Sequence, residues 1–121
     1  MPHDEIHYRI FKFIEAQPDI SQRQLAKALG ISLGKTNYCL RALIDKGQVK
    51  ARNFQRNPGK RNYVYLLTRK GIEEKAQLTA RFLKCKMAEY ELLKVEIEQL
   101  KDEFDVLENL NPDMRSEFEH G

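Results

Sequence analysis

Apolar side chains near the start of the chain recur at the spacing of an α-helix. Ile6, Ile10 and Ile14 fall on one face of such a helix. Pro18 follows, and the residue before a proline is pushed out of the α region. The pattern therefore predicts a first helix over residues 3–17.

Two further short helices are predicted next, joined by a tight corner. Ser21 is followed three residues later by Gln24, which is a capping-box signature for a helix that ends near Leu29. Gly30 can adopt the left-handed conformation that such a helix end requires. Ser32 then caps a third helix that Lys46 and Gly47 close. The side chains expected to face inward from this third helix are Thr36, Cys39, Leu40 and Leu43, with Ile44 at the edge.

The periodicity then changes from that of helices to that of strands. Residues 49–54 alternate as a half-buried strand does, and residues 62–67 are rich in aromatic and branched side chains. Residues 57–60 read Asn-Pro-Gly-Lys, which is strong turn chemistry. Three helices followed by such a hairpin predict a winged helix-turn-helix domain over residues 1–68.

A single long helix is predicted over residues 69–110, with Thr68 as its cap, and a disordered tail over residues 111–121. From Tyr90 onward the apolar spacing alternates between three and four, as in a coiled coil. The residues expected at a dimer interface are Leu83, Met87, Tyr90, Leu93, Ile97, Leu100, Phe104 and Leu107. Upstream, an apolar stripe in a shifted phase is expected to pack partly on the winged helix, and it comprises Ile72, Ala76, Thr79, Leu83 and Met87. The predicted fold is mainly α with a small β-hairpin.

Charges beside the heptads favour a parallel homodimer. Glu89 and Glu96 fall at g positions, and Lys94 and Lys101 fall at the e positions that follow them. One further pair, Glu103 with Glu108, is repulsive. Exposed pairs of this kind contribute only about 0.2–1 kcal/mol each, so they set orientation more than affinity. An antiparallel pair and a single helix folded back on its own domain remain open alternatives.

Charge is distributed unevenly along the 121 residues, although the formal net charge is only +3. Residues 1–70 hold fourteen Lys and Arg against five Asp and Glu, and residues 71–121 hold seven against thirteen. The first part is therefore +9 and the second −6. A basic half of this kind favours a polyanionic partner.

The corner and the third helix are typical of a helix-turn-helix that presents a recognition helix to the major groove of double-stranded DNA. Arg41 and Lys35 can donate to guanine or phosphate, Asn37 can pair with adenine, and Gly34 allows a close approach of the helix to the backbone. The basic hairpin can reach phosphates or a minor groove. The predicted DNA-binding residues are Ser32, Leu33, Gly34, Lys35, Asn37, Tyr38 and Arg41 on the helix, and Arg52, Arg56, Lys60 and Arg61 on the hairpin.

The sequence does not favour an enzyme. The three histidines lie near the chain ends, no glycine loop suited to phosphates occurs, and no Cys or His spacing suggests a metal. No cofactor is expected, and Cys39 and Cys85 are interpreted as two reduced thiols. The absence of a long apolar run and the polar N-terminus predict a cytoplasmic protein with no membrane partner.

Together these stretches resemble a known family. The segment ISQRQLAKALGISLGKTNYCLRALIDKGQV, the basic hairpin and the exit VYLLTRKG resemble the MarR-type winged-helix transcriptional regulators, above all their short subgroup associated with exopolysaccharide gene clusters. The resemblance covers residues 6–71. It implies a cytoplasmic bacterial dimer on palindromic operators, with a recognition helix at 33–46 and a wing tip at 56–61. Longer members build a dimer domain with an effector cleft from several N- and C-terminal helices. This chain has one N-terminal helix and one long C-terminal helix, so the binding of a small-molecule effector stays an open question. The wing here also lacks the acidic-basic-acidic run of the family.

The function predicted from the sequence is thus a homodimeric, sequence-specific DNA-binding transcriptional regulator, acting on exopolysaccharide-type genes. The alternative is a protein-interaction scaffold that uses the winged helix and the coiled coil without binding specific DNA. RNA is less favoured, because the deep and narrow major groove of RNA excludes a helix.

Overall fold

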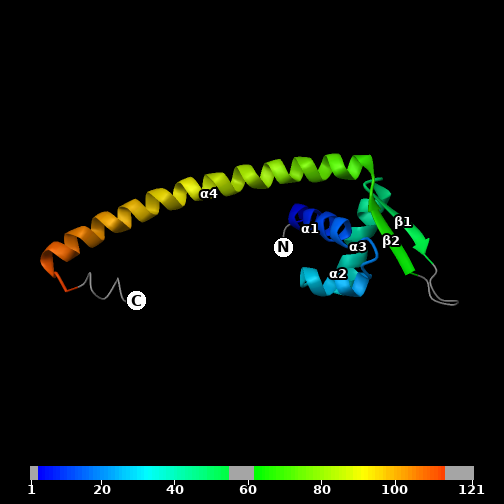
Figure 1. The fold of residues 1–121 in the computed structure, drawn as a ribbon, viewed down its shortest axis with the longest axis horizontal. Helices are drawn as coiled ribbons and strands as arrows, with labels where there is room; N and C mark the ends of the chain where they lie inside the picture. The colour runs from blue at the N-terminus through cyan, green and yellow to red at the C-terminus, as the bar shows by residue number, and fades with distance from the viewer. Residues whose placement is uncertain (1–2, 55–61, 114–121) are drawn as a thin grey trace. The chain divides into compact units, whose positions relative to one another are not determined.

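The computed structural model describes residues 3–54 and 62–113. Its elements are α1 (His3–Ala16), α2 (Gln22–Leu29), α3 (Leu33–Asp45), β1 (Val49–Phe54), β2 (Asn62–Leu67) and α4 (Arg69–Leu110) (Figure 1). The chain divides into two compact units, Met1–Arg81 and Phe82–Gly121. We call the first the winged unit, and we call residues 82–110 of α4 the distal segment.

The helix-turn-helix corner forms through the predicted caps. The hydroxyl of Ser21 accepts a hydrogen bond from the Gln24 backbone, and the Gln24 side chain accepts one from the Ser21 backbone in return. Gly30 ends α2 with φ of 72°, a left-handed conformation that glycine adopts without steric cost. The Oγ atom of Ser32 accepts from the Lys35 amide at 3.1 Å and so begins α3. The predicted capping box, corner and third helix are confirmed.

The core of the winged unit lies between the three short helices and the hairpin. The predicted inner face of α3 is confirmed, since Thr36, Cys39, Leu40 and Leu43 are all buried. The largest fully buried side chains of the other elements are Ile6, Ile10, Phe11, Ile14, Leu25 and Leu78. Burying each large aliphatic or aromatic side chain contributes roughly 1.5–3 kcal/mol. This core fixes the orientation of α3.

The hairpin pairs β1 with β2 in antiparallel register, with Val49 opposite Leu67 and Phe54 opposite Asn62. The edge of β2 is tied to the segment between α1 and α2, because the Tyr65 amide donates to the Pro18 carbonyl at 2.9 Å. Val49 and Tyr65 are buried, whereas Lys50 and Arg52 are exposed. The predicted hairpin is therefore confirmed, and its basic side chains face outward.

The start of α4 is locked to the junction between α3 and β1. The Thr68 hydroxyl donates to the Gly47 carbonyl at 2.5 Å and accepts from the Gly71 amide at 3.1 Å. The Thr68 amide donates to the Gln48 carbonyl at 3.0 Å. Thr68 is thus the cap that the sequence predicts, and it ties three backbone segments together.

The face of α4 that packs on the winged unit differs from the prediction. Gly71 and Leu78 are buried, while Ile72 and Leu83 remain 56 % and 58 % exposed. Gly71 and Leu78 are seven residues apart and share one face, whereas Ile72 is turned by about 100° from Gly71. The sequence predicts that the stripe Ile72, Ala76, Thr79, Leu83 and Met87 packs partly on the winged helix. All five are exposed, so this prediction is wrong for the stripe as a whole, although Ile72 lines a small cavity with Ile14 of α1 and Leu66 of β2.

Two ion pairs accompany this packing within the winged unit. Lys75 pairs with Glu15, and the Arg81 guanidinium lies 2.7 Å from the Asp4 carboxylate. All four side chains are at least partly exposed, so the pairs contribute little free energy on their own. They connect α4 to both ends of α1.

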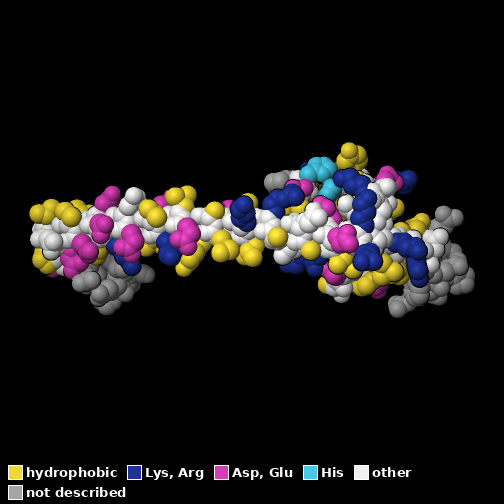
Figure 2. All heavy atoms as spheres, turned by 90° about the horizontal axis from the view of Figure 1, so that it is seen from above, with side chains coloured by type: hydrophobic (Ala, Val, Ile, Leu, Met, Phe, Trp, Pro, Cys, Tyr) yellow, Lys and Arg dark blue, Asp and Glu magenta, His cyan; other side chains and the backbone are white. Residues whose placement is uncertain are grey.

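The distal segment exposes apolar side chains along its described length. Tyr90, Leu93, Ile97, Leu100 and Leu107 are between 43 % and 63 % exposed. Figure 2 shows apolar side chains interleaved with acidic ones along this part of α4. Exposed apolar side chains that recur along a helix in this way are expected at an interaction surface. Residues 114–121, which hold most of the predicted tail, lie outside the described residues.

None of the described helices combines the length and the apolar character that crossing a membrane requires.

His7 is a buried titratable group that makes stability depend on pH. Its side chain is 8 % exposed, and its Nε2 atom has no hydrogen-bond partner among the described residues. Burial lowers the pKa of His7 below its ordinary value, the His3 and Lys46 charges lower it further, and Asp4 opposes them. The unfolded chain therefore takes up a proton near pH 6.5 that the folded chain resists.

We expect the free energy of unfolding to be unaffected by His7 above about pH 7.5 and to fall as the pH drops below about 6.5. Urea unfolding from pH 8 to 5 would measure this. His7→Leu removes the titration, so its curve should be flatter than that of the wild type. Parallel curves for the two proteins would contradict the assignment.

Candidate DNA interface

The outer face of α3 is exposed to solvent, because its inner face packs against the core. Lys35, Tyr38 and Arg41 are exposed there, with Tyr38 66 % exposed. Leu33 is 43 % exposed, and an added Cβ at Gly34 would meet nothing within 4 Å. The start of α3 is thus an uncovered helix N-terminus. Its partial positive charge and backbone N–H groups suit a phosphate.

Asn37, one of the predicted base-reading residues, takes part in a hydrogen-bond chain within the domain. Its Nδ2 atom donates to the Gln22 side-chain oxygen at 3.0 Å, and it is only half-exposed. Gln22 donates in turn to the Tyr65 hydroxyl at 3.4 Å. This chain of hydrogen bonds links the start of α2, the middle of α3 and the hairpin. Tertiary packing brings Gln22 beside Asn37, so the Asn37 amide helps to position α3 in addition to the base contact predicted for it.

Arg9 supports the corner from α1, and the sequence offered no specific signal for it. Its guanidinium donates to the carbonyls of Ala28 at 3.0 Å and Leu29 at 3.4 Å, and it lies 5.9 Å from the centre of the Phe13 ring. A cation at a helix C-terminus is stabilised by the helix dipole. Arg9 therefore satisfies the last carbonyls of α2 and fixes the corner that leads into α3.

The hairpin contributes exposed basic side chains on β1, namely Lys50 and Arg52. The remaining predicted wing residues, Arg56, Lys60 and Arg61, lie outside the described residues. Figure 2 shows Lys and Arg side chains gathered on the winged unit. The described part of the hairpin thus agrees with the basic surface expected there.

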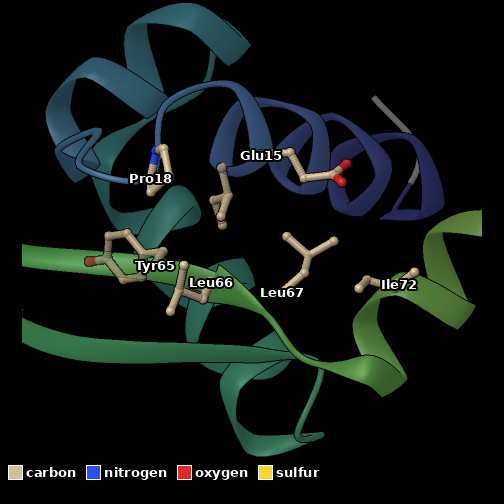
Figure 3. Close-up of a pocket in the computed structure, with 7 residues that line it drawn as sticks. Glu15, Pro18, Tyr65, Leu66, Leu67 and Ile72 are labelled. Carbon is tan, nitrogen blue, oxygen red and sulfur yellow. The ribbon is translucent and has the colours of Figure 1, made fainter.

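A small cavity lies between the end of α1, β2 and the start of α4 (Figure 3). Its volume is about 250 Å³, and its lining comprises Ile14, Glu15, Pro18, Tyr65, Leu66, Leu67 and Ile72. The one charged group in this lining, Glu15, is already paired with Lys75. The cavity is smaller than the roughly 300–1,000 Å³ that ligand pockets typically occupy.

The cysteines take different positions. Cys39 is buried, and burial raises the pKa of its thiol, which Lys35 lowers in part. A thiol with a raised pKa is a poor nucleophile. Cys85 is exposed on α4. No group of three or more His, Cys, Asp or Glu side chains in the described part of the chain is placed to hold a metal ion.

Comparison with known proteins defines the class of this domain. Residues 3–50 match the model of the winged helix-turn-helix DNA-binding family. The domain formed by these residues is thus a winged helix-turn-helix. A search of curated proteins found no match.

Solved structures with the same fold include regulators of the MarR family. A MarR/EmrR family transcriptional regulator from Acinetobacter sp. ADP1 is 19 % identical with a TM-score of 0.55, covering 82 % of this chain and 74 % of its own. Streptococcus pneumoniae FabT in complex with DNA is 23 % identical, with a TM-score of 0.53 and coverage of 90 % and 76 %. The S. aureus MepR–DNA complex is 18 % identical, with a TM-score of 0.57 and coverage of 86 % and 78 %. These likenesses show the fold that the chain shares.

Proposed function

We propose that this chain is a MarR-type cytoplasmic transcriptional regulator that binds specific double-stranded DNA as a homodimer. The observation that carries the proposal is the uncovered outer face of α3, where Lys35, Tyr38 and Arg41 surround the open N-terminus at Gly34. Two of the similar structures, FabT and MepR, are DNA complexes, which supports the same use of the fold here.

The distal segment supports the proposed homodimer. Its exposed a and d residues, such as Leu93 and Leu100, need a partner of matching pattern, which a second copy provides. In the single chain Lys94 lies 3.7 Å from Glu91 and Lys101 lies 4.0 Å from Glu98. These exposed pairs are weak, so both lysines can turn to Glu89 and Glu96 of a parallel second copy.

A parallel homodimer with one recognition helix per copy predicts a palindromic operator. Half-sites for such dimers are about 10–10.5 bp apart, or a multiple of that. We propose exopolysaccharide-type genes as the targets, on the resemblance of residues 6–71 to that subgroup. An inverted repeat upstream of such genes that the protein protects from nuclease would support this assignment, and protection confined to unrelated loci would refute it.

The proposal is tested by selecting bound sequences from randomised duplexes. We expect the selected pool to converge on an inverted repeat, which a gel-shift titration separates from its scrambled version. Equal affinity for both duplexes would reject sequence-specific binding. Partners that survive nuclease treatment, together with no measurable duplex affinity, would favour the protein-interaction scaffold instead.

Arg41→Ala should separate base reading from phosphate binding. Arg41 lies on the outer face of α3, and a bidentate contact to guanine contributes about 1–3 kcal/mol. We expect the variant to lose about 10- to 100-fold in affinity for the selected repeat and to discriminate less against scrambled DNA.

The matched variant is Arg52→Ala on the exposed face of β1. It should weaken both duplexes alike and reduce the slope of log affinity against log salt by about one unit. Titrations at several salt concentrations measure both effects. Indistinguishable behaviour of the two variants would contradict this division of roles.

A further inference from the structure

A single heptad register extends along α4 well beyond the predicted coiled coil. Counted back by sevens from Tyr90 at a and Leu93 at d, four of the five residues of the upstream stripe fall on a and d positions, and Met87 departs from them. The a positions are Ala76, Leu83, Tyr90, Ile97 and Phe104, and the d positions are Ile72, Thr79, Lys86, Leu93, Leu100 and Leu107. The expected shift of phase therefore does not occur.

Lys86 is the one charged residue among these eleven positions. Its side chain is 76 % exposed, and its Nζ atom lies 3.2 Å from an oxygen of Glu89. Glu89 occupies the g position that borders the heptad seam. An ammonium group is thus placed where apolar side chains would give the tightest association.

We propose that Lys86 limits the association of α4 to two copies. The proposal rests on the homodimer proposed above and names the residue that sets its size. A single Asn or Lys at an a position of a coiled coil specifies oligomeric state at some cost in stability, and we extend this argument to Lys86 at a d position. In this chain the Lys86 ammonium can stay out of the apolar seam by pairing with the Glu89 carboxylate at its border.

Lys86 favours two strands because its seam position is more exposed to water in a two-stranded coil than in a coil of three or four helices. In a two-stranded coil the seam is open on both sides, so the stem of Lys86 can cover apolar surface while its ammonium reaches Glu89 and water. In a bundle of three or four helices the same position is enclosed on all sides. Burying an unpaired ammonium there is strongly unfavourable. The lysine therefore disfavours the larger assemblies much more than the dimer.

Restriction to two copies matters because of the geometry of the proposed DNA site. A dimer has one two-fold axis, which matches the symmetry of an inverted repeat. A trimer or tetramer of α4 would present recognition helices that this operator has no half-site for. Lys86 thus links the composition of the helix seam to the symmetry of the DNA.

The test is sedimentation equilibrium of the full chain from about 1 to 100 μM, with the wild type compared to Lys86→Leu and to Lys84→Leu. Lys84 is exposed at a b position two residues away, so its variant removes the same charge and adds the same apolar surface off the seam. We expect the wild type and Lys84→Leu to reach two chain masses, and Lys86→Leu to form three- or four-chain species.

A wild-type dimer with a Lys86→Leu protein that remains a dimer at every concentration would overturn the role of Lys86 and leave the homodimer intact. Larger species in Lys84→Leu as well would also overturn it, because added apolar surface alone would then explain them. A wild type that stays monomeric would overturn the homodimer and this inference together. Circular dichroism of each variant confirms that α4 is still helical.

Discussion

Gly71→Ala is expected to lower the free energy of unfolding of the winged unit by about 3 kcal/mol or more, which is the upper end of what overpacking costs. A Cβ at this position would lie 2.0 Å from the Gln48 carbonyl oxygen and 3.0 Å from its carbon. The obstacle is backbone, which cannot rotate away as a side chain can. Alanine is favoured over glycine in a helix by only about 0.5–1 kcal/mol, so the clash dominates.

Relief of the clash would require α4 to move away from the junction of α3 and β1. That movement would break the hydrogen bond from the Thr68 amide to Gln48 and the one from the Thr68 hydroxyl to Gly47. Urea unfolding followed by tyrosine fluorescence measures the effect, and the chain has no tryptophan to interfere. Gly34→Ala is the matched control, since nothing lies within 4 Å of its added Cβ. Equal stability of Gly71→Ala and the wild type would contradict this packing.

Gly34→Glu is expected to reduce affinity for duplex DNA by about 100-fold or more while leaving the fold intact. The added carboxylate would block the access of phosphates to the N-terminus of α3, and its charge would repel them. An added Cβ meets nothing within 4 Å and the residue is exposed, so a longer side chain can extend into solvent. An acidic residue in the first turn of a helix stabilises it by about 0.3–1 kcal/mol. The same carboxylate would stand between the N-terminus of α3 and the phosphates, and would repel them.

The expected result is therefore a protein that unfolds at the same or a higher urea concentration than the wild type and yet fails to shift the duplex. Gly34→Ala should retain most of the affinity, because a methyl group adds no charge. Undiminished binding by Gly34→Glu would show that the N-terminus of α3 does not face DNA. Loss of stability in Gly34→Glu would contradict the open space around Gly34, because a side chain there would then meet neighbouring atoms.

Local sequence signals predicted the elements of the winged unit well. Ser21, Gly30 and Ser32 act within one or two turns of the residues they cap, so their roles can be inferred from spacing alone. The inner face of α3 follows from helical periodicity for the same reason. Four of its inward residues, with Thr36 among them, are buried as expected.

Contacts between distant elements could not be inferred in this way. Asn37 has the residue type and spacing of a base-reading side chain, but Gln22 lies beside it only after α2 and α3 pack together. Arg9 and the carbonyls of α2 are brought together by the same packing. Local propensity carries no information about such partners.

The face of α4 that packs on the winged unit is determined by the close approach of Gly71 to the Gln48 backbone. Gly71 appeared in the sequence as the only glycine of a long helix, with no indication of its neighbour. Its approach to Gln48 sets the rotation of α4 and therefore places Leu78 inside and the heptad positions outside. Periodicity identified the apolar stripe but could not tell which of two adjacent faces meets the domain. The dimer interface and the DNA contacts remain predictions that the experiments above address.

We propose that two copies of this chain bind one duplex through their α3 helices. Sedimentation of the protein with a fluorescent duplex that carries the selected inverted repeat measures how many chains bind each duplex. We expect a complex of two chains per duplex, which the scrambled duplex does not form at the same salt concentration. A protein that sediments as a single chain and leaves the duplex unbound at low salt would contradict it.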